Sequence, residues 1–355
     1  MAQRIAMVLA LAVELAASSA VGALQHAILP SASSVPLEAV TAVDTRVYTR
    51  EGQLIPVEGR RRLNLLCMGL GSPVVVLESG AGDGAASWRR VQAEIAKSTR
   101  VCAYDRAGYG FSDPSGRPAD ARNAVADLHA LLKEAGLHHP VVLVGHSVGG
   151  LYAELFAATY PRQIAGMVLV DPTGLDDFRL VKEIISDEER VQQRRNFLKR
   201  SANYAHCLDL AQRGDLVASL APECAPSPTG DPVLDKEARR QMAQPKYWQT
   251  FQSEMTNFLP QDHPVGTDSV ITAQVRSRPL RLGRKPFVVI KTPGGAPPGK
   301  RGERLRAESG AVAERLVTAS TRGKLVQVAS GHYVQLEHPD LVVGPIREVL
   351  EAVRN

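Results

Sequence analysis

The sequence predicts an α/β domain with a mostly parallel central sheet, helices on both faces of it, and a helical insertion between two strands. Three observations predict this fold. Short valine-rich runs recur along the chain, and most are continuous rather than alternating, as in strands buried on both faces. Helical patterns separate these runs, as expected for parallel sheets. This alternation stops between residue 173 and about residue 284, where helix-like segments dominate.

The expected elements follow in chain order. The strands are 47–57 and 62–68, which resemble a hairpin with Glu58 and Gly59 near its turn, then 73–77, 100–104, 141–144, 167–170, 287–290 and 324–328. The helices between and after them are 88–96, 119–135, 150–160, 303–319 and 341–353. The insertion shows helical patterns at 178–209 and 236–258, around a Pro- and Gly-containing stretch at 221–232.

These patterns divide the chain into four segments. Residues 1–36 form a leader, 37–172 the first part of the core, 173–284 a helical cap over the carboxyl edge of the sheet, and 285–355 the second part of the core. Apolar residues of the cap are expected to form mainly a small core of its own, with a few lining a substrate pocket. They are Phe178, Leu180, Tyr204, Trp248, Phe251, Phe258 and Leu259.

Composition excludes several classes of function. The hydrophobic fraction of 44% and charged fraction of 22% are ordinary for a soluble globular protein. The net charge of +5 is mild for 355 residues, and the basic residues are scattered without interleaved aromatics, so we expect no nucleic-acid partner. No C-x-x-C pair occurs, and no nucleotide-binding glycine motif stands in the right context, so we expect no metal and no cofactor.

The N-terminus has the pattern of an export signal. Arg4 precedes an apolar stretch at 5–13, and small residues follow. Glu14 interrupts the stretch, although 5–29 is long enough to cross a bilayer. We therefore expect an exported protein, periplasmic or secreted, or one associated with a membrane through its N-terminus; a cytosolic amphipathic leader is the alternative. Four cysteines suit an oxidising compartment, with four reduced thiols as the alternative.

The strongest motif is G-x-S-x-G at 145–149, between the strand 141–144 and a helix. In this context the motif is a nucleophile elbow, in which Ser147 sits on a strained turn. A side chain at Gly145 or Gly149 would crowd the opposing backbone. The following helix directs its N-terminal amides toward the place where an oxyanion would form. Ser147 is therefore the expected nucleophile.

With this elbow, the sequence resembles the α/β-hydrolase superfamily over nearly all of residues 45–355. Residues 74–88 look like the strand and turn that supply an oxyanion-hole amide in that family, which implies Ala81 and Val148 as the two donors. Ser79 stands where many members have histidine, so we expect different side-chain support for the turn. Residues 104–113 are similar to a structural loop of the family, which implies that Asp105 and Arg106 are scaffold.

His332 is the expected general base. The family order is serine, then acid, then histidine, which leaves His206, His263, His332 and His338. His206 and His263 fall in the cap, and His338 precedes a proline at the last helix. His332 alone follows a core strand, behind Gly331, which permits a turn.

The acid is open among three positions. Many family members place it after the strand that is 287–290 here, but no carboxylate follows that strand before Glu303. A minority place it after the strand beyond the elbow, where this chain has Asp171. We favour Asp171, with Glu303 or Glu308 as alternatives and a dyad without an acid as the last one.

The resemblance also implies two disulfides. In this fold the strands that hold Cys67 and Cys102 are antiparallel neighbours, at a distance that a disulfide can span. Cys207 and Cys224 would then close a short loop within the cap.

The motifs together predict a serine hydrolase that cleaves a small carboxylic ester through an acyl-enzyme. A serine nucleophile disfavours the aspartate-dependent members, which are epoxide hydrolases and dehalogenases. An amidase or peptidase of the same fold is the first alternative, and a ligand-binding or inactive homologue is the second.

Overall fold

The computed structural model describes residues 44–177, 186–217, 222–259, 268–294 and 299–355. The predicted leader, 1–36, lies outside them. An eight-stranded sheet forms the centre of the molecule, in the order β1-β2-β4-β3-β5-β6-β7-β8. The β1–β2 and β2–β4 pairs are antiparallel, and all later pairs are parallel. The mostly parallel sheet predicted from the sequence is confirmed.

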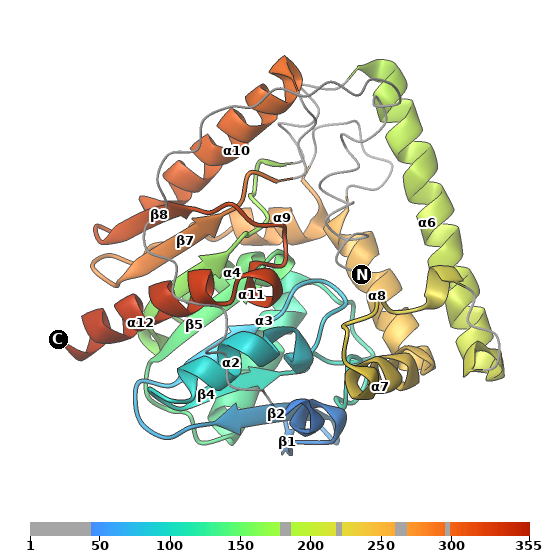
Figure 1. Ribbon diagram of the computed structural model, residues 1–355, viewed down its shortest axis with the longest axis horizontal. Helices are drawn as coiled ribbons and strands as arrows, with labels where there is room; N and C mark the ends of the chain where they lie inside the picture. Colours follow the sequence, from blue (N-terminus) through green and yellow to red (C-terminus); the bar gives the residue numbers. More distant parts are fainter. Residues whose placement is uncertain (1–43, 178–185, 218–221, 260–267, 295–298) are drawn as a thin grey trace.

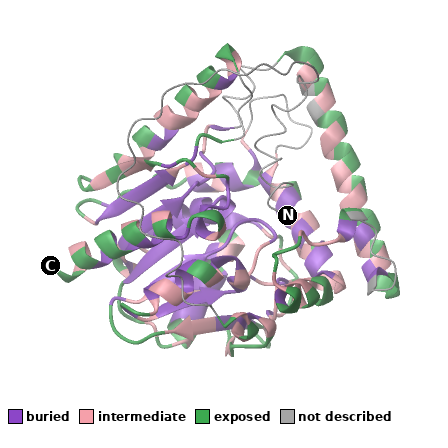
Figure 2. Ribbon diagram, viewed as in Figure 1, coloured by how far each residue is buried: buried purple, intermediate pink, exposed green. Residues whose placement is uncertain are grey.

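The strands are short; β3 to β7 are almost entirely buried, whereas β1, β2 and β8 are partly exposed (Figure 2). Their bounds are β1 Gln53–Pro56, β2 Arg62–Met68, β3 Val75–Glu78, β4 Val101–Tyr104, β5 Val141–His146, β6 Ile164–Val170, β7 Phe287–Lys291 and β8 Gly323–Gln327. Consecutive residues of β3 show why a continuous apolar run is needed, because they point to opposite faces. Val75 and Leu77 pack in one core layer and Val76 in the other.

Helices cover both faces of the sheet (Figure 1). One layer contains α2 Arg89–Ile95, α11 Val334–Glu337 and α12 Asp340–Arg354. The other contains α3 Ala121–Glu134, α4 Val148–Thr159, α9 Val270–Arg276 and α10 Lys300–Val317. Short 3-10 helices are η3 Thr45–Thr49, η4 Ala85–Trp88, η5 Pro161–Gln163, η6 Asp215–Val217 and η7 Pro222–Cys224.

The insertion between β6 and β7 contributes α6 Asp187–Arg213, α7 Pro232–Met242, α8 Pro245–Phe258 and α9. The expected helix at 236–258 is two helices, because Pro245 starts a new one after Gln244. Trp248, Phe251 and Phe258, expected mainly in a separate cap core, instead belong to the same buried cluster as residues of α3 and α4. Phe178 and Leu180 lie outside the described residues. The limits 173–284 stay a prediction.

The strand expected at 47–57 is wrong in its first half. Residues Thr45–Thr49 form η3, whose first turn is capped by the Asp44 side chain. Tyr48 is buried, and its hydroxyl donates to Gln92 Oε1 at 3.0 Å. Tyr48 is therefore buried against α2 rather than in the hairpin.

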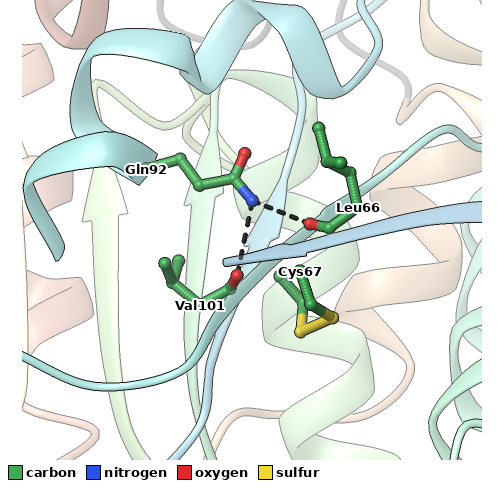
Figure 3. Close-up of a disulfide and its surroundings, with 5 residues drawn as sticks. Leu66, Cys67, Gln92 and Val101 are labelled. Carbon is green, nitrogen blue, oxygen red and sulfur yellow. Dashed lines mark hydrogen bonds between the residues drawn. A yellow bond between two sulfur atoms is a disulfide. The ribbon is translucent and has the colours of Figure 1, made fainter. Parts of the chain in front are cut away.

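Both predicted disulfides are present. Cys67 and Cys102 are direct partners in the antiparallel β2–β4 register, with Cα atoms 4.0 Å apart. Beside this bond, Gln92 Nε2 donates to Leu66 O at 2.7 Å and to Val101 O at 3.3 Å, so one side chain joins the same two strands (Figure 3). The second bond joins Cys207 and Cys224, 17 residues apart within the insertion. Among the described residues, no helix is both long and apolar enough to span a membrane.

Candidate active site

Three parallel strands bring their carboxyl ends to one edge of the sheet. His146, the last residue of β5, pairs with Val170 of β6, and Val170 pairs with Ile290 of β7. Ser147 and Asp171, which follow β5 and β6, therefore lie on neighbouring strand ends. This edge is where open α/β sheets bind ligands.

Ser147 has the strained backbone expected of an elbow. Its φ is +55°, a value that side-chain-bearing residues rarely adopt, and it directly precedes α4. Its N–H donates to Val170 O at 3.2 Å, which ties the turn to β6. A Cβ on Gly149 would lie 2.4 Å from Ser79 O, so α4 starts in direct contact with the end of β3. The crowding predicted at Gly149 is confirmed.

His332 lies against Asp171. Its Nδ1 is 2.6 Å from Asp171 Oδ2, and both side chains are buried. Asp171 has φ +39° and accepts the Thr292 N–H at 3.2 Å on its other oxygen. His332 Nε2 is buried and has no partner among the described residues. With Nδ1 on the carboxylate, Nε2 is free to accept a proton.

Asp171 is held in its charged form by a lysine at the end of the next strand. Burial alone would raise the pKa of Asp171. The Lys291 ammonium, 3.2 Å from Oδ1, and the hydrogen bond to His332 outweigh burial and lower this pKa below its usual range. Lys291 also donates to Pro172 O at 3.3 Å. Neither Glu303 nor Glu308, both on α10, makes a described contact with His332.

His146 fixes the loop that carries His332. Its Nε2 lies 2.9 Å from His332 O, and because a carbonyl only accepts, this nitrogen carries the proton. Burial, reinforced by the nearby His332, lowers the pKa of His146 to about 3. His146 is therefore neutral at ordinary pH and joins the elbow to the histidine loop as a structural donor.

Two backbone N–H groups next to the elbow have no acceptor among the described residues. They belong to Ala81, in the turn after β3, and to Val148, at the start of α4. The neighbouring Gly82 N–H is bound to Glu254 Oε2 at 3.0 Å. The two amides that the family resemblance implies as oxyanion-hole donors are therefore free to bind an oxyanion.

Ser79 and Asp105 support the turn. Ser79 Oγ donates to Gly84 O at 3.1 Å, in place of the histidine of many relatives. Asp105 accepts the N–H of Ala85 at 2.7 Å and of Phe111 at 3.0 Å, so it organises two loops at once.

A cavity of about 380 Å³ opens beside the turn. Gly82 and Asp83 line it next to Ala81, and Tyr333 lines it next to His332. Tyr109 and Tyr247 add aromatic walls. Among the described residues, no three His, Cys, Asp or Glu side chains gather in a way that could hold a metal ion.

Sequence reasoning missed two participants. Sequence reasoning considered only carboxylates after the strand 287–290 and so passed over Lys291. A charged residue at the end of a buried strand is itself a signal of a polar site. Glu254 lies on the same helix face as Tyr247 and Phe251, and a carboxylate among aromatics at helical spacing indicates a buried polar contact.

Parts of this chain are similar in sequence to curated proteins. A 2-hydroxy-6-oxo-2,4-heptadienoate hydrolase of Pseudomonas putida is 34% identical over 135 residues, 37% of this chain and 48% of the relative. An uncharacterized protein of Bacillus subtilis is 32% identical over 127 residues, 36% and 47% of the two chains. The matched part thus spans less than half of each curated relative.

Solved structures share the fold. An esterase from Thermogutta terrifontis superposes with a TM-score of 0.53 at 20% identity, over 86% of this chain and 100% of the other. A haloalkane dehalogenase from Agrobacterium tumefaciens gives 0.60 at 18% identity, over 86% and 99%. The model of the alpha/beta hydrolase family matches residues 74–344, and the chain belongs to that family.

Proposed function

We propose that the protein is a serine hydrolase that cleaves carboxylic esters. The observation that carries this proposal is the elbow serine, Ser147, at the same sheet edge as the buried His332–Asp171 pair. The two free amides of Ala81 and Val148 support it, because acyl transfer needs donors for a developing oxyanion.

The proposed reaction has two steps. Ser147 Oγ attacks the ester carbonyl while His332 Nε2 takes its proton, and the amides of Ala81 and Val148 bind the oxyanion. His332 returns the proton to the leaving alcohol, which departs and leaves an acyl-enzyme. Water, activated by His332, then attacks the acyl carbon and releases the carboxylic acid and free Ser147. Asp171 stabilises the imidazolium in both steps.

The nucleophile separates this proposal from other reactions of the fold. Dehalogenases and epoxide hydrolases are among the solved structures with this fold, at identities that show the fold alone. Those chemistries use a carboxylate nucleophile, whereas the elbow residue here is Ser147. The cavity of about 380 Å³ is lined by neighbours of Ala81 and His332 but not by Ser147 or His332, so it lies beside the nucleophile rather than on it.

The test is a series of p-nitrophenyl esters of increasing acyl length, assayed with wild type and Ser147→Ala. We expect hydrolysis to be fastest for short acyl groups and to fall at least a thousandfold in the variant. Ser277→Ala, a matched change of an exposed serine on the surface, should retain wild-type rates. Full activity of Ser147→Ala would overturn the proposal.

One observation favours a second candidate, an amidase or peptidase for substrates with a free amine. Asp83 lines the cavity beside Tyr333, and burial raises the pKa of its carboxyl to about 6 against the opposing effects of Arg106 and Tyr333. Its carboxylate could bind an ammonium group there. Two anilides test this candidate, one of an amino acid and one of its deaminated analogue. The candidate predicts that wild type cleaves the amine-bearing anilide faster and that this preference is lost when Asp83 is replaced.

We also propose that the protein is exported or anchored through its N-terminus. Two disulfides support an oxidising compartment. Fractionation of cells expressing the full chain, followed by thiol labelling without reductant, tests this proposal. Activity confined to the cytosolic fraction with four labelled thiols would contradict it.

A further inference from the structure

A buried carboxylate of the insertion contacts the turn that carries Ala81. Glu254, on α8, is 1% exposed, and each of its oxygens accepts two hydrogen bonds. Oε2 accepts from the Gly82 N–H at 3.0 Å and the Tyr109 hydroxyl at 2.7 Å. Oε1 accepts from Arg106 Nη2 and the Tyr152 hydroxyl, both at 3.0 Å. These four donors fill the usual acceptor sites of a carboxylate, so its position is fixed.

Arg106 fixes the peptide bond that ends in the Ala81 N–H. Its Nη2 donates to Gly80 O at 2.7 Å, and this peptide bond is trans. A trans peptide directs its C=O and N–H to opposite sides, so the Ala81 N–H points away from Arg106. Glu254 binds the next amide, that of Gly82. Together Arg106 and Glu254 hold the peptide planes on both sides of Ala81.

The Arg106–Glu254 pair is itself anchored in the core. Arg106 Nη1 donates to Glu78 Oε1 at 2.8 Å. Burial opposes the charge of Arg106, but Glu254 and Glu78 outweigh it and raise its pKa. Burial, and then Glu254, raise the pKa values of Tyr109 and Tyr152, so both phenols keep the protons that they donate.

Helix α8 packs directly on this turn. Tyr247, Phe251 and Glu254 lie on one helix face at positions i, i+4 and i+7. A Cβ on Gly82, whose φ is +73°, would lie 2.8 Å from Phe251 Cε2 and 3.2 Å from the Tyr247 hydroxyl. The turn therefore has no room to move toward the helix.

We propose that Glu254 is a positioning residue for the reaction proposed above, on which this inference rests. Through Gly82 and Arg106, Glu254 holds the turn so that the Ala81 N–H points at the developing oxyanion. The insertion thus contributes to the catalytic geometry as well as covering the sheet edge.

The test compares an ester with its thionoester, in which sulfur replaces the carbonyl oxygen, in wild type and Glu254→Gln. Glutamine keeps the shape but replaces one acceptor oxygen by a donor, so it cannot accept all four bonds. Sulfur is a weak acceptor, so the ester/thionoester ratio of kcat/KM reports hydrogen bonding to the oxyanion. We expect this ratio and the kcat for the ester to fall about tenfold, with KM little changed.

The ratio separates positioning from folding. Unfolded molecules turn over neither substrate, so a lower folded fraction leaves the ratio unchanged. Glu348→Gln, the same change in an exposed ion pair with Lys324, should keep the wild-type ratio. If Glu254→Gln gives no soluble protein, Tyr109→Phe removes one donor to the same Oε2, and the loss of this one hydrogen bond should lower the ratio roughly two- to threefold.

Two results have different meanings. A wild-type ratio in Glu254→Gln, or in Tyr109→Phe if that variant is used, overturns this inference and leaves the proposed function intact. Wild-type protein that hydrolyses neither substrate, or Ser147→Ala that retains hydrolysis, overturns the proposed function and this inference with it.

Discussion

Asp171 meets several constraints at one position. Its backbone has φ +39°, its side chain is buried, and its oxygens contact His332 Nδ1, the Thr292 N–H and the Lys291 ammonium. A strained backbone and a buried charge both reduce stability, and such residues are concentrated at functional sites. In the proposed reaction, orienting His332 is the role that explains both features.

Exchange of this acid should therefore affect turnover far more than exchange of the alternatives. Asp171→Asn preserves shape but removes the charge and favours the wrong tautomer of His332, so kcat should fall about 10³- to 10⁴-fold. Glu308→Gln and Glu303→Gln should stay within about twofold of wild type, as surface changes do. Steady-state kinetics on one ester measures all three, and wild-type turnover in Asp171→Asn would contradict the proposed role.

At this scale the sequence left the acid open for a physical reason. Strand ends that meet at one edge are set by strand order and register, which local patterns do not report. Once Val170 pairs with Ile290, Asp171 and Lys291 become neighbours. Ser147 and His332 needed less information, because the elbow motif and the family order were enough to select them.

At the scale of elements, the start of α4 and the end of β3 must touch. A Cβ on Gly149 would lie 2.4 Å from Ser79 O and 2.8 Å from Glu78 O, both backbone atoms. Gly149→Ala should therefore push the elbow away from the turn and lower kcat/KM at least about 100-fold.

Gly310→Ala is the matched control, because its added Cβ in α10 would meet only Gln327 Nε2 at 3.9 Å, an ordinary van der Waals contact. This change should leave activity unchanged and raise the free energy of unfolding by about 0.5–1 kcal/mol. Urea denaturation and ester hydrolysis on both variants check the pair. Wild-type activity of Gly149→Ala would show that the close contact is not required.

The helices were predicted better than the surfaces against which they pack. Periodicity shows that α8 has a buried face, but not what covers that face. Trp248 and Phe251 therefore suited a separate cap core equally well, and only the structure places them in the main core. The break before Pro245 was visible in the sequence, whereas η3 depends on the contact of Tyr48 with Gln92, a residue 44 positions away.

At the scale of the whole molecule, one buried carboxyl group links stability to pH. Glu154, on α4, is 3% exposed, and burial, with Asp177 nearby, raises its pKa to about 8. The unfolded chain releases this proton near pH 4.5 and the folded protein only near pH 8. Between these values the unfolded state binds fewer protons, so the free energy of unfolding falls as pH rises.

Glu154→Gln has no such proton to lose. Its stability relative to wild type should increase from about pH 5 to pH 8 by an amount on the order of a few kcal/mol, and then level off. Urea denaturation at several pH values measures this difference, with Glu348→Gln as the exposed control. Parallel stability curves for Glu154→Gln and wild type would contradict the burial argument.

The sequence predicted the global architecture more completely than it predicted individual contacts outside the elbow. Valine-rich runs are explained by strands with two buried faces, and the family resemblance then supplied the strand order that places Cys67 against Cys102. The polar network around Glu254 joins residues from β3, the loop after β4, α4 and α8, and no pattern local to one of them could reveal it.

The central claim is that Ser147 is the nucleophile of an acyl-enzyme, and covalent labelling tests it most directly. A fluorophosphonate should leave one phosphonyl group per chain, because its product cannot be released by the water that clears an ester. After digestion, mass spectrometry should find this group on the peptide containing Ser147, with ester hydrolysis lost in proportion to labelling. Complete labelling of Ser147 with hydrolysis unchanged, or inactivation with the label elsewhere, would contradict the account.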